Sequence, residues 1–176
     1  TCLALGATAK KIGQNEEAAK LYSKVFYLNH SPGSRKQAAF AAGRLYYQIQ
    51  HYEQAEQWLT RYMNLVEDQS DQQFYESCLW LGKTCRALGN ETNACQALRT
   101  ALNGQFSKQH HMQVVSGLIE SYLKQERYIE AFEVLNDTDM RRFSRSDTIR
   151  VLILKSRVLR GMGLTDKAVT LLTDRE

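Results

Sequence analysis

One small residue recurs along this chain at a nearly constant interval, and that regularity limits the possible folds more than any other feature. Successive members of a series of five alanines stand 37, 39, 37 and 37 residues apart, and a glycine precedes each of the first three by twelve residues. Repetition of this kind predicts stacked repeats rather than one closed globular core. The alanines are Ala18, Ala55, Ala94, Ala131 and Ala168, and the glycines are Gly6, Gly43 and Gly82.

The spacing of apolar residues within the units is typical of helices. Lys36–Gln48 has apolar residues at intervals of three and four, and Leu79–Leu88 and Val114–Leu123 show the same pattern. No segment alternates apolar and polar residues over the length of a strand. We therefore predict an all-α chain.

Glycine and polar segments divide the chain at matching points of each unit. Gly13 and Gly89 should end the first helix of their units, because such turns often need a left-handed residue. The other predicted breaks are residues 31–34, 104, 136–137, 144–147 and 161–163.

The third unit shows the pattern most clearly, with Cys78, then Leu81 and Gly82, then Cys85, and Ala94 and Leu98 in its second half. Each unit resembles a tetratricopeptide repeat, in which small residues let two antiparallel helices approach closely. The resemblance implies an α-solenoid of about ten helices in about five antiparallel hairpins, with the right-handed superhelix of that family. It would form a single domain over 1–176. The repeats would span about 1–33, 34–70, 71–106, 107–143 and 144–176.

Several further expectations follow from the resemblance. The three glycines and the first four alanines of the series should be buried at helix contacts, and Tyr52 and Tyr128 should begin second helices. The units are longer than the usual repeat of about 34 residues, and Lys155 stands where an apolar residue is usual. Because no polar capping helix follows Leu172, we expect the chain to be part of a longer protein.

The four cysteines do not form a recognisable metal or redox motif. Cys2, Cys78, Cys85 and Cys95 include no C-x-x-C pair. We expect them to be reduced and buried, which favours a cytoplasmic location. No run of 18 apolar residues is present, so we expect no membrane span.

The sequence contains none of the common catalytic motifs, so we expect no enzyme activity and no cofactor. His110 and His111 are adjacent, and neighbouring helical residues point in different directions, which makes them poor joint metal ligands. Arg141-Arg142-Phe143-Ser144 has the form of a basophilic kinase site, but an N-cap role for Ser144 is the favoured interpretation.

The clearest functional signal is the distribution of charge. The resemblance implies that first helices line a concave groove, and of the positions turned to it nine carry Lys or Arg and two carry Glu. The whole chain has a net charge of only +4. A basic groove favours an acidic or carboxylate-bearing peptide. The candidate contact residues are Lys10, Phe40, Arg44, Tyr47, Leu79, Lys83, Arg86, Lys124, Arg150, Arg157 and Arg160.

The function that this pattern favours is a non-catalytic scaffold or adaptor that binds another protein. Two alternatives stay open: an assembly module whose groove is filled by its own chain or by another copy, and a regulatory repeat domain of a larger enzyme or signalling protein. Nucleic-acid binding is disfavoured, because aromatic residues for base stacking do not recur in the groove from unit to unit.

Overall fold

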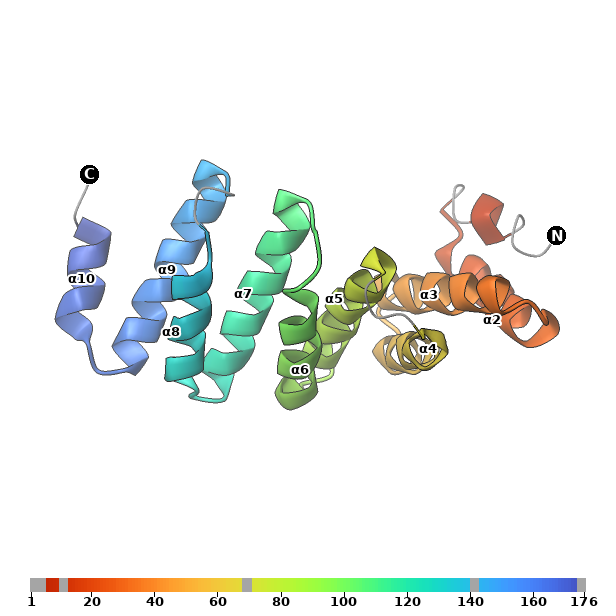
Figure 1. The fold of residues 1–176 in the computed structure, drawn as a ribbon, viewed down its shortest axis with the longest axis horizontal. Coiled ribbons are helices and arrows are strands. Elements are labelled where there is room, and N and C mark those ends of the chain that lie inside the picture. Colours follow the sequence, from red (N-terminus) through yellow and green to blue (C-terminus); the bar gives the residue numbers. More distant parts are fainter. Residues whose placement is uncertain (1–5, 10–12, 68–70, 140–142, 174–176) are drawn as a thin grey trace. The chain divides into compact units, whose positions relative to one another are not determined.

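A computed structural model describes residues 6–9, 13–67, 71–139 and 143–173, and every regular element in these ranges is a helix (Figure 1). Residues 6–9 are helical, and further helices follow along the chain. The all-α prediction is confirmed. The helices are α2 (Asn15–Leu28), α3 (Pro32–Gln48), α4 (Tyr52–Leu65), α5 (Gln72–Ala87), α6 (Glu91–Ala101), α7 (Lys108–Lys124), α8 (Tyr128–Asp137), α9 (Arg145–Gly161) and α10 (Thr165–Thr173).

The helices fall into two compact units. Unit 1 is Thr1–Asn90 and contains α2 to α5, and unit 2 is Glu91–Glu176 and contains α6 to α10. The division lies between the two helices of the third expected repeat. The expectation of a single domain over the whole chain therefore stays a prediction.

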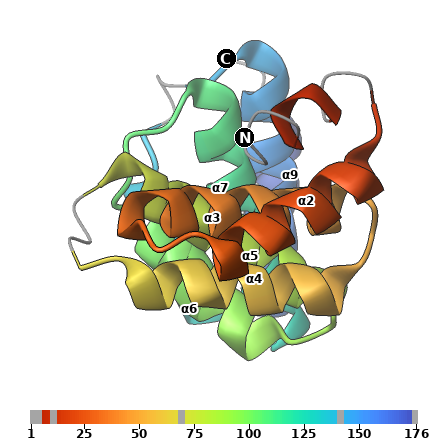
Figure 2. The ribbon, with the colours of Figure 1, turned by 90° about the vertical axis from the view of Figure 1, so that its right-hand side faces the viewer.

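Unit 1 is built around α3, which contacts α2, α4 and α5 (Figure 2). Its helix contacts are lined by small side chains, including Ala18, Ala39 and Ala42, none of which is accessible to solvent. Larger side chains such as Leu59 and Tyr62 of α4 complete the core. Small residues on one helix and large ones on the next allow the close packing that the sequence predicted.

Unit 2 repeats this arrangement around α7, which contacts α6, α8 and α9. Its buried side chains include Val115, Leu118 and Ile119 of α7 and Val151 and Val158 of α9. The helices α7 and α9 are the first helices of successive hairpins, and they run in the same direction (Figure 1). A face of unit 2 is thus formed by two parallel helices.

Each predicted break lies at or near a helix end, although residues 32–34, 136–137 and 145–147 are themselves helical. Gly13 and Gly89 have positive φ angles of 81° and 77°, as expected. Two residues that are not glycine, Gln50 with φ 63° and Glu126 with φ 58°, have the same left-handed backbone in the second and fourth repeats. The Ser144 hydroxyl accepts a hydrogen bond from the Asp147 amide, so Ser144 caps α9 as predicted.

The burial expected of the repeat residues is confirmed. The three glycines and the first four alanines of the series are buried, and Tyr52 and Tyr128 begin α4 and α8. Cys78, Cys85 and Cys95 are free thiols and buried, whereas Cys2 lies outside the described residues. In the described part of the chain, no helix is long and apolar enough to cross a membrane.

Candidate partner-binding surfaces

The first candidate surface lies on α3 and α5 of unit 1 and combines positive charge with aromatic rings. The Lys83 ammonium lies 4.4 Å from the centre of the Trp80 ring, and the Arg44 guanidinium lies 5.0 Å from it. Tyr47 completes the group, with its ring centre 5.3 Å from that of Trp80. We call Arg44, Tyr47, Trp80 and Lys83 the Trp80 cluster.

The Trp80 cluster favours negative charge. Burial lowers the pKa of Lys83, and the nearby Arg44 lowers it further. Both causes disfavour the charged ammonium, so an anion that contacted both cations would offset them. Burial also raises the pKa of Tyr47, whose hydroxyl stays a neutral hydrogen-bonding group.

Two residues predicted to line the groove lie instead in the core. Phe40 is 6% exposed and Leu79 is 1% exposed. Phe40 packs against Tyr62 of α4, with ring centres 5.3 Å apart. The expectation that these side chains offer apolar contact to a partner was wrong. The half-buried Trp80, which the sequence analysis missed, stands beside Leu79 and provides aromatic surface there.

The second candidate surface is a hollow of about 250 Å³ between α7 and α9 of unit 2. On α7 the lining residues are four apart, and on α9 they follow spacings of three and four, so each set occupies one helix face. Two of the seven, Arg150 and Arg157, are contact residues predicted from the sequence. The lining residues of this first hollow are Met112, Ser116, Glu120, Arg150, Ile153, Leu154 and Arg157.

A second hollow, of about 390 Å³, adjoins the first. It is lined by Leu123, Tyr128, Arg157, Arg160 and Gly161. Because Arg157 lines both hollows, they lie next to each other along α9, and we call the two together the α9 recess.

Arg150, Arg157 and Arg160 of α9 are exposed, and none of them forms an ion pair within the described ranges. Arg150 and Arg157 are seven residues apart, which places them on the same side of the helix. The structure thus brings Arg150, Arg157 and Arg160, all predicted contact residues, to the two hollows of unit 2.

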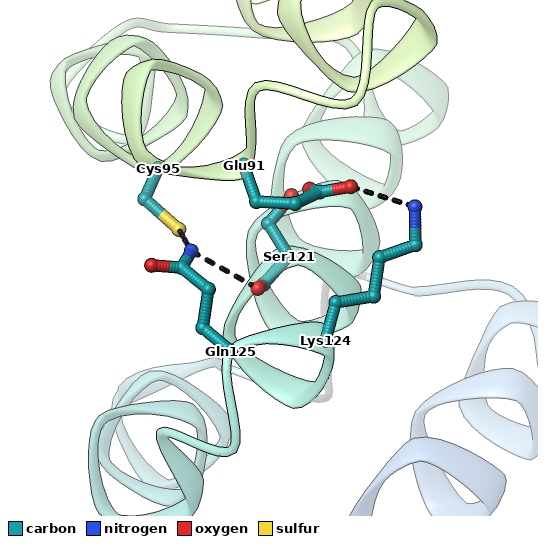
Figure 3. A network of polar contacts seen from close by, with 5 residues as sticks. All are labelled: Glu91, Cys95, Ser121, Lys124 and Gln125. Atoms are coloured by element: carbon teal, nitrogen blue, oxygen red, sulfur yellow. Dashed lines mark hydrogen bonds and ion pairs between the residues drawn. The ribbon is translucent and has the colours of Figure 1, made fainter.

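Lys124 differs from these arginines because its charge is already paired. Its ammonium donates a hydrogen bond to the Glu91 carboxylate at 2.6 Å, and the Glu91 side chain is only 11% exposed (Figure 3). Beside this pair, the Gln125 amide donates to the Cys95 sulfur at 3.3 Å and to the Ser121 carbonyl at 3.2 Å. Lys124 therefore joins α7 to α6 rather than adding a free positive charge to the surface.

The other predicted residues are placed as follows. Arg86 is half-buried on α5, on the same helix as Lys83. Lys10 lies outside the described residues. His110 and His111 pack edge-on to Phe106 and flat on Phe143, respectively. Among the described residues, no group of three or more His, Cys, Asp or Glu side chains could hold a metal ion.

Comparison with known proteins agrees with the repeat assignment. Residues 75–103 match the family model described as a tetratricopeptide repeat. No curated protein matches the sequence.

Solved structures share the fold at low sequence identity. MamA is 18% identical with a TM-score of 0.75, covering 97% of this chain and 86% of its own. A Podosopora anserina protein related to kinesin light chains, with nearly identical TPR-like repeats, is 17% identical with a TM-score of 0.72, covering 97% and 90%. BtubC from P. vanneervenii is 14% identical with a TM-score of 0.69, covering 96% and 74%.

Tetratricopeptide-like repeats generally mediate contacts between proteins. The chain carries a tetratricopeptide repeat at residues 75–103, within a helical-repeat fold of the tetratricopeptide type.

Proposed function

We propose that this protein is a non-catalytic binding module that holds an acidic segment of another protein against the first helices of its repeats. The observation that carries the proposal is the row of exposed arginines, Arg150, Arg157 and Arg160, along the two hollows between α7 and α9. Arginine suits this role because its planar guanidinium binds carboxylates through two parallel hydrogen bonds.

The binding energy would come from several modest contributions. An exposed ion pair contributes about 0.2–1 kcal/mol, so no single arginine suffices. Apolar contact adds to them, and Ile153, which is 50% exposed beside Arg150, offers such contact. The summed positive field would also speed the encounter with an acidic partner, more strongly at low salt.

The Trp80 cluster supports the same proposal in unit 1. The Arg44 guanidinium lies 5.4 Å from the Phe40 ring as well as 5.0 Å from Trp80, so two rings hold it in place. An arginine already ordered by its neighbours loses less conformational entropy when it binds a carboxylate. We therefore propose this cluster as a second contact for an acidic partner.

A second candidate function is self-association through α10. Val169 and Leu172 are 54% and 55% exposed. The residues that match Leu172 in the earlier repeats, Leu59, Leu98 and Leu135, are all buried. If α10 packs against another copy, Leu172→Lys should lower the mass measured by light scattering. An unchanged monomer mass in parent and variant would reject this function.

The acidic-partner proposal can be tested without a known partner. The protein would be used to select binders from a displayed library of random dodecapeptides. We expect selected peptides to be enriched in Asp and Glu over the starting library, and the Arg150→Glu, Arg157→Glu variant to lose this enrichment. Selection without acidic enrichment, or enrichment that survives in the variant, would reject the proposal.

A further inference from the structure

Arg157 stands between two hollows that each have apolar walls. The first hollow contains the buried side chains of Met112 and Leu154, together with Ile153. The second is lined by Leu123 and by the Tyr128 ring, which packs directly against Gly161 where a Cβ atom would otherwise lie. The recess therefore places one guanidinium between two regions that favour aliphatic side chains.

The spacing of the hollows limits which ligand can fill both. Leu154 and Gly161 are seven residues apart on α9, which corresponds to about 10 Å along the helix axis. A polyproline II segment rises about 3.1 Å per residue and has three residues per turn. Side chains three positions apart in such a segment therefore point to the same side and are about 9 Å apart, close to the axial separation of Leu154 and Gly161.

Both hollows are large enough to accept a side chain. Their volumes of about 250 and 390 Å³ far exceed the roughly 30 Å³ that one water molecule occupies in the liquid. The residues between two inserted side chains would lie over Arg157, and carboxylates there would also approach Arg150 and Arg160.

We infer that this recess recognises an extended acidic segment in which two large aliphatic residues, three positions apart, bracket acidic residues. The inference rests on the proposed function and adds the spacing of the apolar residues to it. Charge alone attracts any acidic peptide, whereas the two hollows select those whose aliphatic side chains match their separation.

Two capped octapeptides of equal composition and charge separate the inference from the proposed function. In Gly-Ser-Leu-Glu-Glu-Leu-Ser-Gly the leucines are three apart, and in Leu-Gly-Ser-Glu-Glu-Ser-Gly-Leu they are seven apart. Measured by fluorescence anisotropy, the first should bind at least about fivefold more tightly, because both leucines can leave water together. Equal affinities that both fall in the Arg150→Glu, Arg157→Glu variant would overturn the inference and leave the proposed function intact. If neither peptide binds, both the inference and the proposed function are overturned.

A variant that fills one hollow gives a second readout. Ser116 is half-buried on the α7 side of the first hollow, so Ser116→Leu should occupy it. We expect this change to remove the preference for the first peptide. Thr170→Leu, which adds the same side chain at an exposed position of α10, is the matched control and should preserve the preference. A preference that persists in Ser116→Leu would contradict the inference.

Discussion

A Cβ atom placed on Gly43 of α3 would lie 2.7 Å from the Cγ atom of Leu59 on α4, so these two residues set how closely the helices of this hairpin approach. Gly43→Ala should therefore overpack the contact and lower the free energy of unfolding by about 1–3 kcal/mol. Urea denaturation followed by circular dichroism measures the change.

The same helix offers a control at Gly33. A Cβ there would meet only the Ser31 hydroxyl, 4.0 Å away. Gly33→Ala should stabilise the protein by up to about 1 kcal/mol, because alanine is the better helix former. Equal losses for the two variants would mean that the α3–α4 contact is not limited by volume.

The left-handed residues at the hairpin turns give a prediction of opposite sign. Gln50 and Glu126 have positive φ where other repeats have glycine, and a side chain makes this conformation costly. Gln50→Gly should stabilise the protein by about 0.5–1 kcal/mol, since relief of strain exceeds the entropy lost by glycine. Gly89→Ala, at the matching position of the next repeat, should destabilise it. A destabilised Gln50→Gly variant in the same denaturation assay would show that the turn is not strained.

The repeat register could be predicted from the sequence because it depends on small residues that recur at fixed intervals. The exposure of individual side chains could not be predicted in this way, as Phe40, Leu79 and Ile153 show. They occupy the same position of the second, third and fifth repeats, yet Phe40 and Leu79 are buried and Ile153 is 50% exposed. Exposure at that position depends on side chains from other helices, such as Tyr62 against Phe40, and a pattern within one helix does not contain them.

The sequence also did not predict which charged side chains form ion pairs. Lys124 and Glu91 are 33 residues apart and meet only because α6 and α7 pack together. Lys155, which replaces an apolar residue in the repeat pattern, stays half-buried with its ammonium 5.8 Å from the Phe132 ring. The aromatic ring of Phe132 thus accommodates a cation at a position where the repeat pattern usually has an apolar residue.

Thiol reactivity should report the packing of α5. Burial raises the pKa of Cys78 to about 11 and that of Cys85 to about 12. Only the thiolate reacts, so in a Cys2→Ser, Cys95→Ser background both remaining thiols should resist labelling by a disulfide reagent at pH 8 and react rapidly in urea. Labelling at the unfolded rate in the native protein would contradict the packing described here.

The same shifts predict how stability depends on pH. The unfolded thiols ionise near their ordinary pKa, whereas the folded ones stay neutral to higher pH. Their contribution to stability is therefore complete at neutral pH and falls as the pH rises from about 9 toward 11–12. Cys78→Ala should make the alkaline loss of stability shallower in urea melts across this range. An unchanged slope would indicate that Cys78 titrates normally in the fold.

The pairing of Glu91 with Lys124 should contribute measurably to stability. Glu91→Gln keeps the shape of the side chain but removes the charge of a nearly buried carboxylate. This change should lower the free energy of unfolding by about 1 kcal/mol. Glu16→Gln is the matched control. Glu16 also stands in the first turn of its helix and pairs with Lys20 at 2.7 Å, but both side chains of this pair are exposed. The control substitution should lower the free energy of unfolding by a smaller amount. A larger loss for Glu16→Gln would contradict the role assigned to burial.

Charge reversal on α9 tests the central claim most directly. The affinity of Gly-Ser-Leu-Glu-Glu-Leu-Ser-Gly would be compared for the parent, Arg150→Glu with Arg157→Glu, and Arg99→Glu with Lys167→Glu. The last pair makes the same change in net charge at exposed positions of α6 and α10. At low salt we expect about a tenfold loss for the α9 variant, nearly none for the control, and a smaller difference at high salt. Equal losses in the two variants, or none in either, would show that the α7–α9 face does not bind the acidic segment.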